Sequence, residues 1–116
     1  MLYSGILDFD DYTGDFIQVE RLIVREDSIS FDGIATWDRR VDAKIHLEAV
    51  AHKNDVGFTS NPTRPNNRIN DQYHPVILSF SRVDVCEDGL EVQGIWRLSG
   101  DDLHFSGVLE KVVITR

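Results

Sequence analysis

Residues 41–51 read VDAKIHLEAVA, and the alternation within this segment indicates the class of fold. The odd positions are apolar without exception: Val41, Ala43, Ile45, Leu47, Ala49 and Ala51. The even positions are polar except for Val50, a period of two that is typical of a half-buried β-strand. Alanine, lysine, leucine and glutamate also favour a helix. However, a helical face through Val41, Ile45 and Ala49 would also carry Lys44 and Glu48, so we predict a strand.

The same alternation returns along the rest of the chain. It is regular over residues 28–37, 76–80, 90–98 and 103–109, and less regular over residues 2–9, 16–25 and 56–59. Short breaks rich in aspartate, asparagine and glycine separate most of these segments, and such residues supply turn geometry. Short connections join antiparallel strands, because parallel strands need long crossovers. The sequence therefore predicts an all-β single domain over residues 1–116. We expect an antiparallel up-and-down meander of about eight strands, closed or nearly closed into a β-barrel.

Charge and composition exclude several classes of function. The chain has 116 residues and 41% hydrophobic residues, enough for one core. It carries 20 acidic against 12 basic residues, a net charge of −8, and shows no basic cluster. A negative field repels phosphate backbones, so we expect neither nucleic-acid nor membrane binding. The single cysteine, Cys86, and a start without a basic region before its apolar residues favour a cytoplasmic protein.

The acidic residues are concentrated near the N-terminus. Residues 1–20 hold Asp8, Asp10, Asp11 and Asp15 together with Glu20, and no basic residue. A field of one sign steers partners of the opposite sign and weakens with salt. We therefore expect these four aspartates to dock a basic protein partner, as in an adaptor or immunity protein.

One connection is much longer than the others. Residues 60–75 are polar and nearly free of aliphatic side chains. Loops of this length are usually either functional or disordered, and both interpretations stay open. If the loop recognises a ligand, its most interactive side chains are Arg64, Arg68 and Tyr73.

A short motif near the C-terminus resembles a known family. Gly94-Ile95-Trp96 is similar to the Gly-X-Trp element of calycin-type barrels, the lipocalin and avidin group. This resemblance implies a closed barrel with space for a small apolar ligand. In lipocalins the element lies near the N-terminus, whereas here it lies near the C-terminus. The secretion signal and disulfides usual in lipocalins are also missing from this sequence.

Many positions predicted to face inward are small. They are Gly33, Ala35, Ala43, Ala49, Ala51, Gly94 and Gly107. Small residues serve the bends and taper of a packed barrel, or they leave a cavity for one small ligand. In the second case Trp37 and Trp96 would line the cavity with flat apolar walls.

No motif for catalysis or metal binding is present. Nucleophile elbows, phosphate loops and zinc-binding helices are all missing from the sequence. His46 and His52 lie about 20 Å apart on one extended strand, and His46 meets His104 only if their strands pair. We therefore predict no catalytic residue, no cofactor and no metal site. An enzyme with an unrecognised site is a third hypothesis, beside the docking of a basic partner and the binding of a small ligand. A homodimer through edge strands is also expected.

Overall fold

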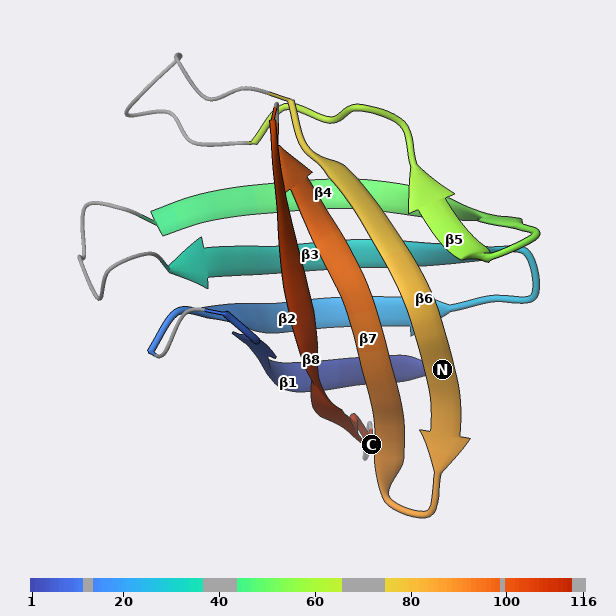
Figure 1. Cartoon of the computed structure of the whole chain (residues 1–116). Coiled ribbons are helices and arrows are strands. Elements are labelled where there is room, and N and C mark those ends of the chain that lie inside the picture. Colours follow the sequence, from blue (N-terminus) through green and yellow to red (C-terminus); the bar gives the residue numbers. More distant parts are fainter. Residues whose placement is uncertain (12–13, 37–43, 66–74, 99, 114–116) are drawn as a thin grey trace.

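The computed structural model describes residues 1–11, 14–36, 44–65, 75–98 and 100–113. These residues form a closed barrel of eight antiparallel strands arranged in chain order (Figure 1). The strands are β1 (Leu2–Phe9), β2 (Phe16–Val24), β3 (Ser28–Thr36), β4 (Lys44–Asn54), β5 (Gly57–Ser60), β6 (Ile77–Cys86), β7 (Gly89–Leu98) and β8 (Asp101–Lys111). The predicted all-β meander is confirmed, and it is closed because β1 pairs with β8 as well as with β2. Its general shape fits a calycin-type barrel.

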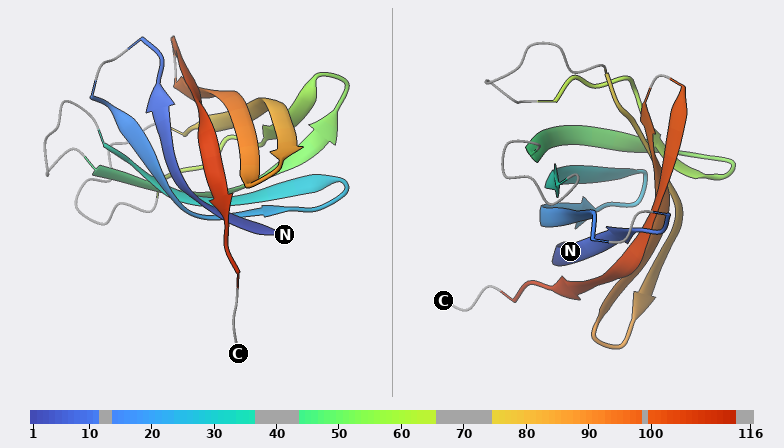
Figure 2. Two further views of the ribbon diagram at one scale, coloured as in Figure 1. Left: turned by 90° about the horizontal axis from the view of Figure 1, so that it is seen from below. Right: turned by 60° about the vertical axis from the view of Figure 1, so that its left-hand side comes forward.

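The barrel consists of two groups of strands that cross at a steep angle. Strands β1–β4 run side by side, and β6–β8 pass across them (Figure 1). The short strand β5 connects the two groups, pairing with β4 through Ala51–Asn54 and with β6 through Phe58 and Thr59. The views from below and from the side show the two groups enclosing one interior (Figure 2). No helix long and apolar enough to cross a membrane occurs in the described ranges.

Aromatic side chains fill part of the interior. Phe9 lies edge-on to both Trp96 and Phe105, with ring centroids 6.4 and 6.5 Å apart. Phe105 in turn contacts Phe80 edge-on, with a centroid distance of 5.9 Å. Four strands therefore contribute to one aromatic cluster, and edge-on contacts of this kind add stability beyond simple burial. All four of these side chains are buried.

Two of the small inward positions accommodate aromatic rings. A Cβ atom at Gly33 would lie 2.7 Å from Cζ of Phe31, too close for any real contact. A Cβ atom at Gly94 would collide with the backbone oxygen of Ser79 and the ring of Phe105. These glycines therefore make space for side chains of the core. Ala43, another of the small positions, lies outside the described residues.

The observed strands differ from the predicted ones mainly beside irregular pairings. The segment predicted at 76–80 continues to Cys86 as β6. A register shift between Phe80 and Arg82 breaks the alternation, because one extra residue reverses the face on which later side chains lie. The β3–β4 ladder has no such shift: it runs without interruption from Ser28 to Thr36.

Candidate functional site

The residues predicted to bind a small ligand do not form one site within the described structure. Trp96 is fully buried in β7 and contacts Phe9 in the core. Arg64 is exposed on the segment that follows β5. The remaining three predictions, Trp37, Arg68 and Tyr73, lie outside the described residues. The structure therefore separates the two predicted residues that it describes, one inside the barrel and the other on its surface.

Three of the four aspartates predicted to bind a partner are exposed. Asp8 belongs to β1, and Asp10 and Asp11 follow the end of that strand. Asp10 is held against β8: its backbone N–H donates to the His104 oxygen at 2.9 Å, and its Oδ1 accepts from Ser106 Oγ at 2.6 Å. Asp15 differs, because it is buried and its backbone oxygen accepts the N–H of Phe9.

Closure of the barrel adds two carboxylates that the sequence did not point to. Asp101 and Asp102 are the first residues of β8 and precede His104, the backbone partner of Asp10. At about 3.3 Å per residue they lie about 7–10 Å further along the strand. The end of β1 and the start of β8 lie side by side (Figure 2). We call Asp8, Asp10, Asp11, Asp101 and Asp102 the acidic end.

Within the described part of the chain, one basic side chain contacts the acidic end. Arg97 of β7 donates to Asp102 through both Nε, at 2.8 Å from Oδ1, and Nη2, at 3.4 Å from Oδ2. Asp102 is therefore neutralised by its neighbour, while Asp8, Asp10 and Asp11 have no ion pair with a described residue. From the sequence, Asp101 and Asp102 were recognisable only as part of a turn. Their proximity to the end of β1 follows from the pairing of β8 with β1, which no local pattern predicts.

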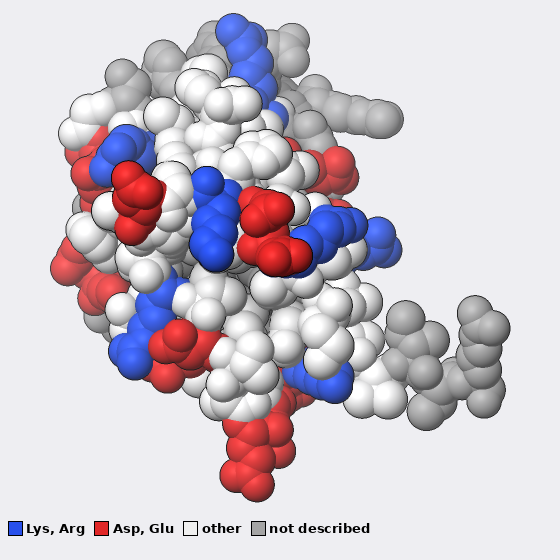
Figure 3. Space-filling view, turned by 90° about the vertical axis from the view of Figure 1, so that its right-hand side faces the viewer, with Lys and Arg blue, Asp and Glu red and all other residues white. Residues whose placement is uncertain are grey.

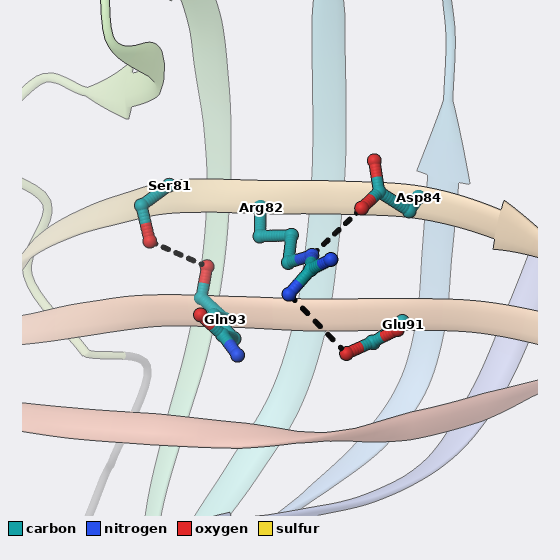
Figure 4. A network of polar contacts seen from close by, with 5 residues as sticks. All are labelled: Ser81, Arg82, Asp84, Glu91 and Gln93. Atoms are coloured by element: carbon teal, nitrogen blue, oxygen red, sulfur yellow. Dashed lines mark hydrogen bonds and ion pairs between the residues drawn. The ribbon is translucent and has the colours of Figure 1, made fainter.

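Elsewhere on the barrel, charges of opposite sign are interspersed. On the face shown in Figure 3, lysine and arginine side chains alternate with aspartate and glutamate. On the outer face of β6 and β7, Arg82 donates to Asp84 at 2.7 Å and lies 3.7 Å from Glu91 (Figure 4). The hydrogen bond with Asp84, and the charges of Glu91 and Asp84, raise the pKa of Arg82 above its usual value. This surface is therefore balanced in charge.

A second polar cluster lies on the outer face of β3 and β4. Asp32 and Glu48 are directly opposite each other in the ladder, and His46 precedes Glu48 by two residues on the same face. Asp32 Oδ1 accepts a hydrogen bond from His46 Nε2 at 2.5 Å, and Glu48 Oε1 lies 3.9 Å from the same nitrogen. Donor atoms of all three side chains lie within 4.8 Å of one another.

At the level of the sequence, His46 was considered as a metal ligand only together with other histidines. His46 and His104 do not meet, because β4 pairs with β3 and β5, and β8 pairs with β7 and β1. The alternation already placed Asp32, His46 and Glu48 on outward faces of successive strands. What it lacked was the register of the hairpin, which decides that Asp32 lies opposite Glu48.

A groove of about 630 Å³ lies beside this cluster on the outer face of β2, β3 and β4. Asp32 and Glu48 form part of its wall, together with Arg21 of β2. Ile23 and Val50 contribute apolar surface, and Thr63 of the segment after β5 also lines the groove. Its volume falls within the range of about 300–1,000 Å³ that is usual for small-ligand sites.

No protein-family model, curated protein or solved structure matches this chain.

Proposed function

We propose that this domain is a non-catalytic docking protein that binds a basic protein partner through its acidic end. The observation that supports this is the contact between Asp10 and β8. It joins the acidic N-terminal segment to Asp101 and Asp102, so that carboxylates far apart in the sequence share one surface.

Packing of the interior favours the outer surface as the region that binds. The largest side chains of the core, among them Trp96, Tyr3 and Phe80, are fully buried. The aromatic cluster around Phe105 occupies space that a ligand would need. Closure also pairs β1 with β8, the two strands at the ends of the meander that would otherwise be its edges. A partner recognised by charge at one end of the barrel requires neither a cavity nor an edge.

The charge of the chain gives this docking a measurable signature. A net charge of −8 attracts a basic partner over distances comparable to the Debye length, about 10 Å at 0.1 M salt. Such attraction accelerates association more than it slows dissociation. The association rate should therefore fall steeply as salt is raised, while the dissociation rate changes little.

The test compares two variants of equal charge by affinity capture from the host lysate. In the first, the four carboxylates of the acidic end that form no ion pair with a described residue are neutralised: Asp8→Asn, Asp10→Asn, Asp11→Asn and Asp101→Asn. In the control, four exposed carboxylates of the β2–β3 and β6–β7 turns are neutralised: Glu26→Gln, Asp27→Asn, Glu87→Gln and Asp88→Asn. Each variant loses four negative charges, which takes the net charge from −8 to −4.

We expect the wild type and the control to retain the same basic protein at low salt, and the acidic-end variant to lose it. Because both variants carry the same net charge, this difference would assign binding to the position of the carboxylates. Equal retention by all three proteins, or an association rate that does not depend on salt concentration, would contradict the proposal.

A calycin-like role, with a small apolar ligand inside the barrel, is the second candidate. It is supported by the closed meander and by Gly94-Ile95-Trp96, in which both Gly94 and Trp96 are buried. A ligand near Trp96 would shift or quench tryptophan fluorescence. Titration of the Trp37→Phe variant with a hydrophobic dye at concentrations below micelle formation would test this, and an unchanged Trp96 emission would count against it.

A further inference from the structure

One polar cluster of the described surface lies at the centre of the β3–β4 ladder. Asp32 and His46 are half-buried, with 29% and 34% of their side chains exposed, and they are held by their mutual hydrogen bond. The β3–β4 ladder around them runs through nine residue pairs without a register shift. Two of the three donor groups are thus fixed on rigid strands, an arrangement that favours precise binding.

The donor atoms fit a divalent transition metal. One imidazole nitrogen with two carboxylate oxygens is a ligand set suited to Zn²⁺, which binds such atoms at about 2.0–2.2 Å. Donors that share a tetrahedral zinc ion lie about 3.4 Å apart. In the structure, His46 Nε2 is 2.5 Å from Asp32 Oδ1 and 3.9 Å from Glu48 Oε1. Glu48 is 57% exposed, so its side chain can rotate toward His46, while Asp32 and His46 have to move apart by about 0.9 Å to share the ion.

The charge of the cluster also favours a dication. Two carboxylates share one imidazole, which is uncharged when it ligates a metal. In that state the three side chains together carry two negative charges, which Zn²⁺ would neutralise. The metal would take the position of the proton that His46 Nε2 now donates to Asp32.

The groove supplies an independent observation. Asp32 and Glu48 line it, so a metal held between them would face a hollow of about 630 Å³. Zinc sites with three protein ligands keep their remaining position for water or an exogenous ligand, whereas structural sites are usually closed by four. The cluster therefore resembles a metal site with an open position, and the groove resembles the pocket for its exogenous ligand.

We propose that Asp32, His46 and Glu48 form a zinc-binding site that opens on the groove between β2 and β4. This proposal is independent of docking through the acidic end, because the two sites share no residue. Zinc would be bound directly by Nε2 of the imidazole and by one oxygen of each carboxylate, and Arg21 would line the same groove.

The test titrates metal-free full-length protein with zinc chloride by calorimetry. All proteins carry Cys86→Ser, because Cys86 is exposed and its thiol is itself a zinc ligand. Three variants each remove one donor: Asp32→Asn, His46→Gln and Glu48→Gln. The matched control is His104→Gln, which removes an exposed imidazole from the outer face of β8. Urea unfolding without metal checks that each variant is folded.

We expect one equivalent of zinc to bind the Cys86→Ser protein and its His104→Gln control with equal affinity. Each donor variant should bind at least about tenfold more weakly, since even the loss of an outer-shell partner costs about 10–100-fold. Zinc should also shift one histidine side-chain nitrogen resonance that is missing from the His46→Gln spectrum. The proposal is overturned if zinc does not saturate at one equivalent, or if the donor variants bind as tightly as the control.

Discussion

The ring of Phe9 meets the indole of Trp96 edge-on, at a centroid distance of 6.4 Å and an interplanar angle of 83°. The two residues come from β1 and β7, strands separated in the barrel by β8. Their contact therefore spans the closing seam and depends on the pairing of β1 with β8. Trp96, with no exposed side-chain surface, reports directly on whether the barrel is closed.

Replacement of Trp96 by alanine should strongly destabilise the barrel. Truncation of a buried aromatic side chain leaves a cavity and removes its contacts, at a cost of about 3–5 kcal/mol. We expect Trp96→Ala to lower the free energy of unfolding in urea by that amount. Ile6→Ala is the control, because Ile6 is 54% exposed on β1, and its loss should be below about 1 kcal/mol. Similar losses in both variants would show that Trp96 is not packed in this way.

Gly94→Ala should destabilise the barrel although it adds only one methyl group. The new Cβ would meet the backbone oxygen of Ser79 on β6 and the ring of Phe105 on β8. Backbone atoms of a paired strand cannot move aside without breaking the ladder, and overpacking of this kind costs about 1–3 kcal/mol.

Gly100→Ala tests the cause of this effect, because a Cβ at Gly100 meets no atom within 4 Å. The φ of Gly100 is 86°, so alanine there is strained by its backbone alone. In urea unfolding, addition of Phe105→Leu to Gly94→Ala should recover part of the lost free energy of unfolding. Addition of Phe105→Leu to Gly100→Ala should recover none of it. An equal response at both positions would rule out collision with the ring.

Arg82→Gln should leave stability almost unchanged. Arg82, Asp84 and Glu91 are exposed or nearly so, and ion pairs on such a surface contribute little because solvent and salt screen them (Figure 4). We expect the urea midpoint to match that of the wild type within experimental error, at low and at high salt. A clear fall at low salt that disappears at high salt would show that this network stabilises the barrel.

The sequence predicted the barrel well because each strand carries its own signal. Alternation in residues 41–51 needs no partner to be recognised, and Ile45, Leu47 and Ala49 are buried as it indicates. The end of β6 was missed because the register shift after Phe80 reverses that alternation. A local pattern therefore predicts a strand until the strand itself departs from the regular pleat.

The candidate sites were harder to predict from the sequence, because they depend on which strands become neighbours. The N-terminal aspartates were visible as a run, but their contact with β8 follows from closure of the barrel, which no local pattern specifies. Asp32 and Glu48 are opposite each other only in the observed register, and a slip of one residue would place them on different faces. Sequence reasoning therefore found residue types, while the structure supplied their neighbours.

Arg21 provides a further test of the zinc site. It lies directly opposite Asp32 in the β2–β3 ladder and lines the same groove. A positive charge at this position opposes a bound dication, by about 1.0–1.4 kcal/mol at a separation of about 6–8 Å even in a medium as polar as water. Removal of the charge in Arg21→Gln should therefore tighten zinc binding about five- to tenfold, measured by calorimetry in the Cys86→Ser protein at low salt.

Arg82→Gln is the matched control for Arg21→Gln, since it removes the same charge from the outer face of β6. Its effect on zinc affinity should be much smaller, because Arg82 lies on a strand distant from β3 in the barrel order. High salt should reduce the gain from Arg21→Gln, as expected for an electrostatic effect. If both variants change the affinity equally, net charge rather than the position of Arg21 governs binding, and zinc is held elsewhere than beside Asp32.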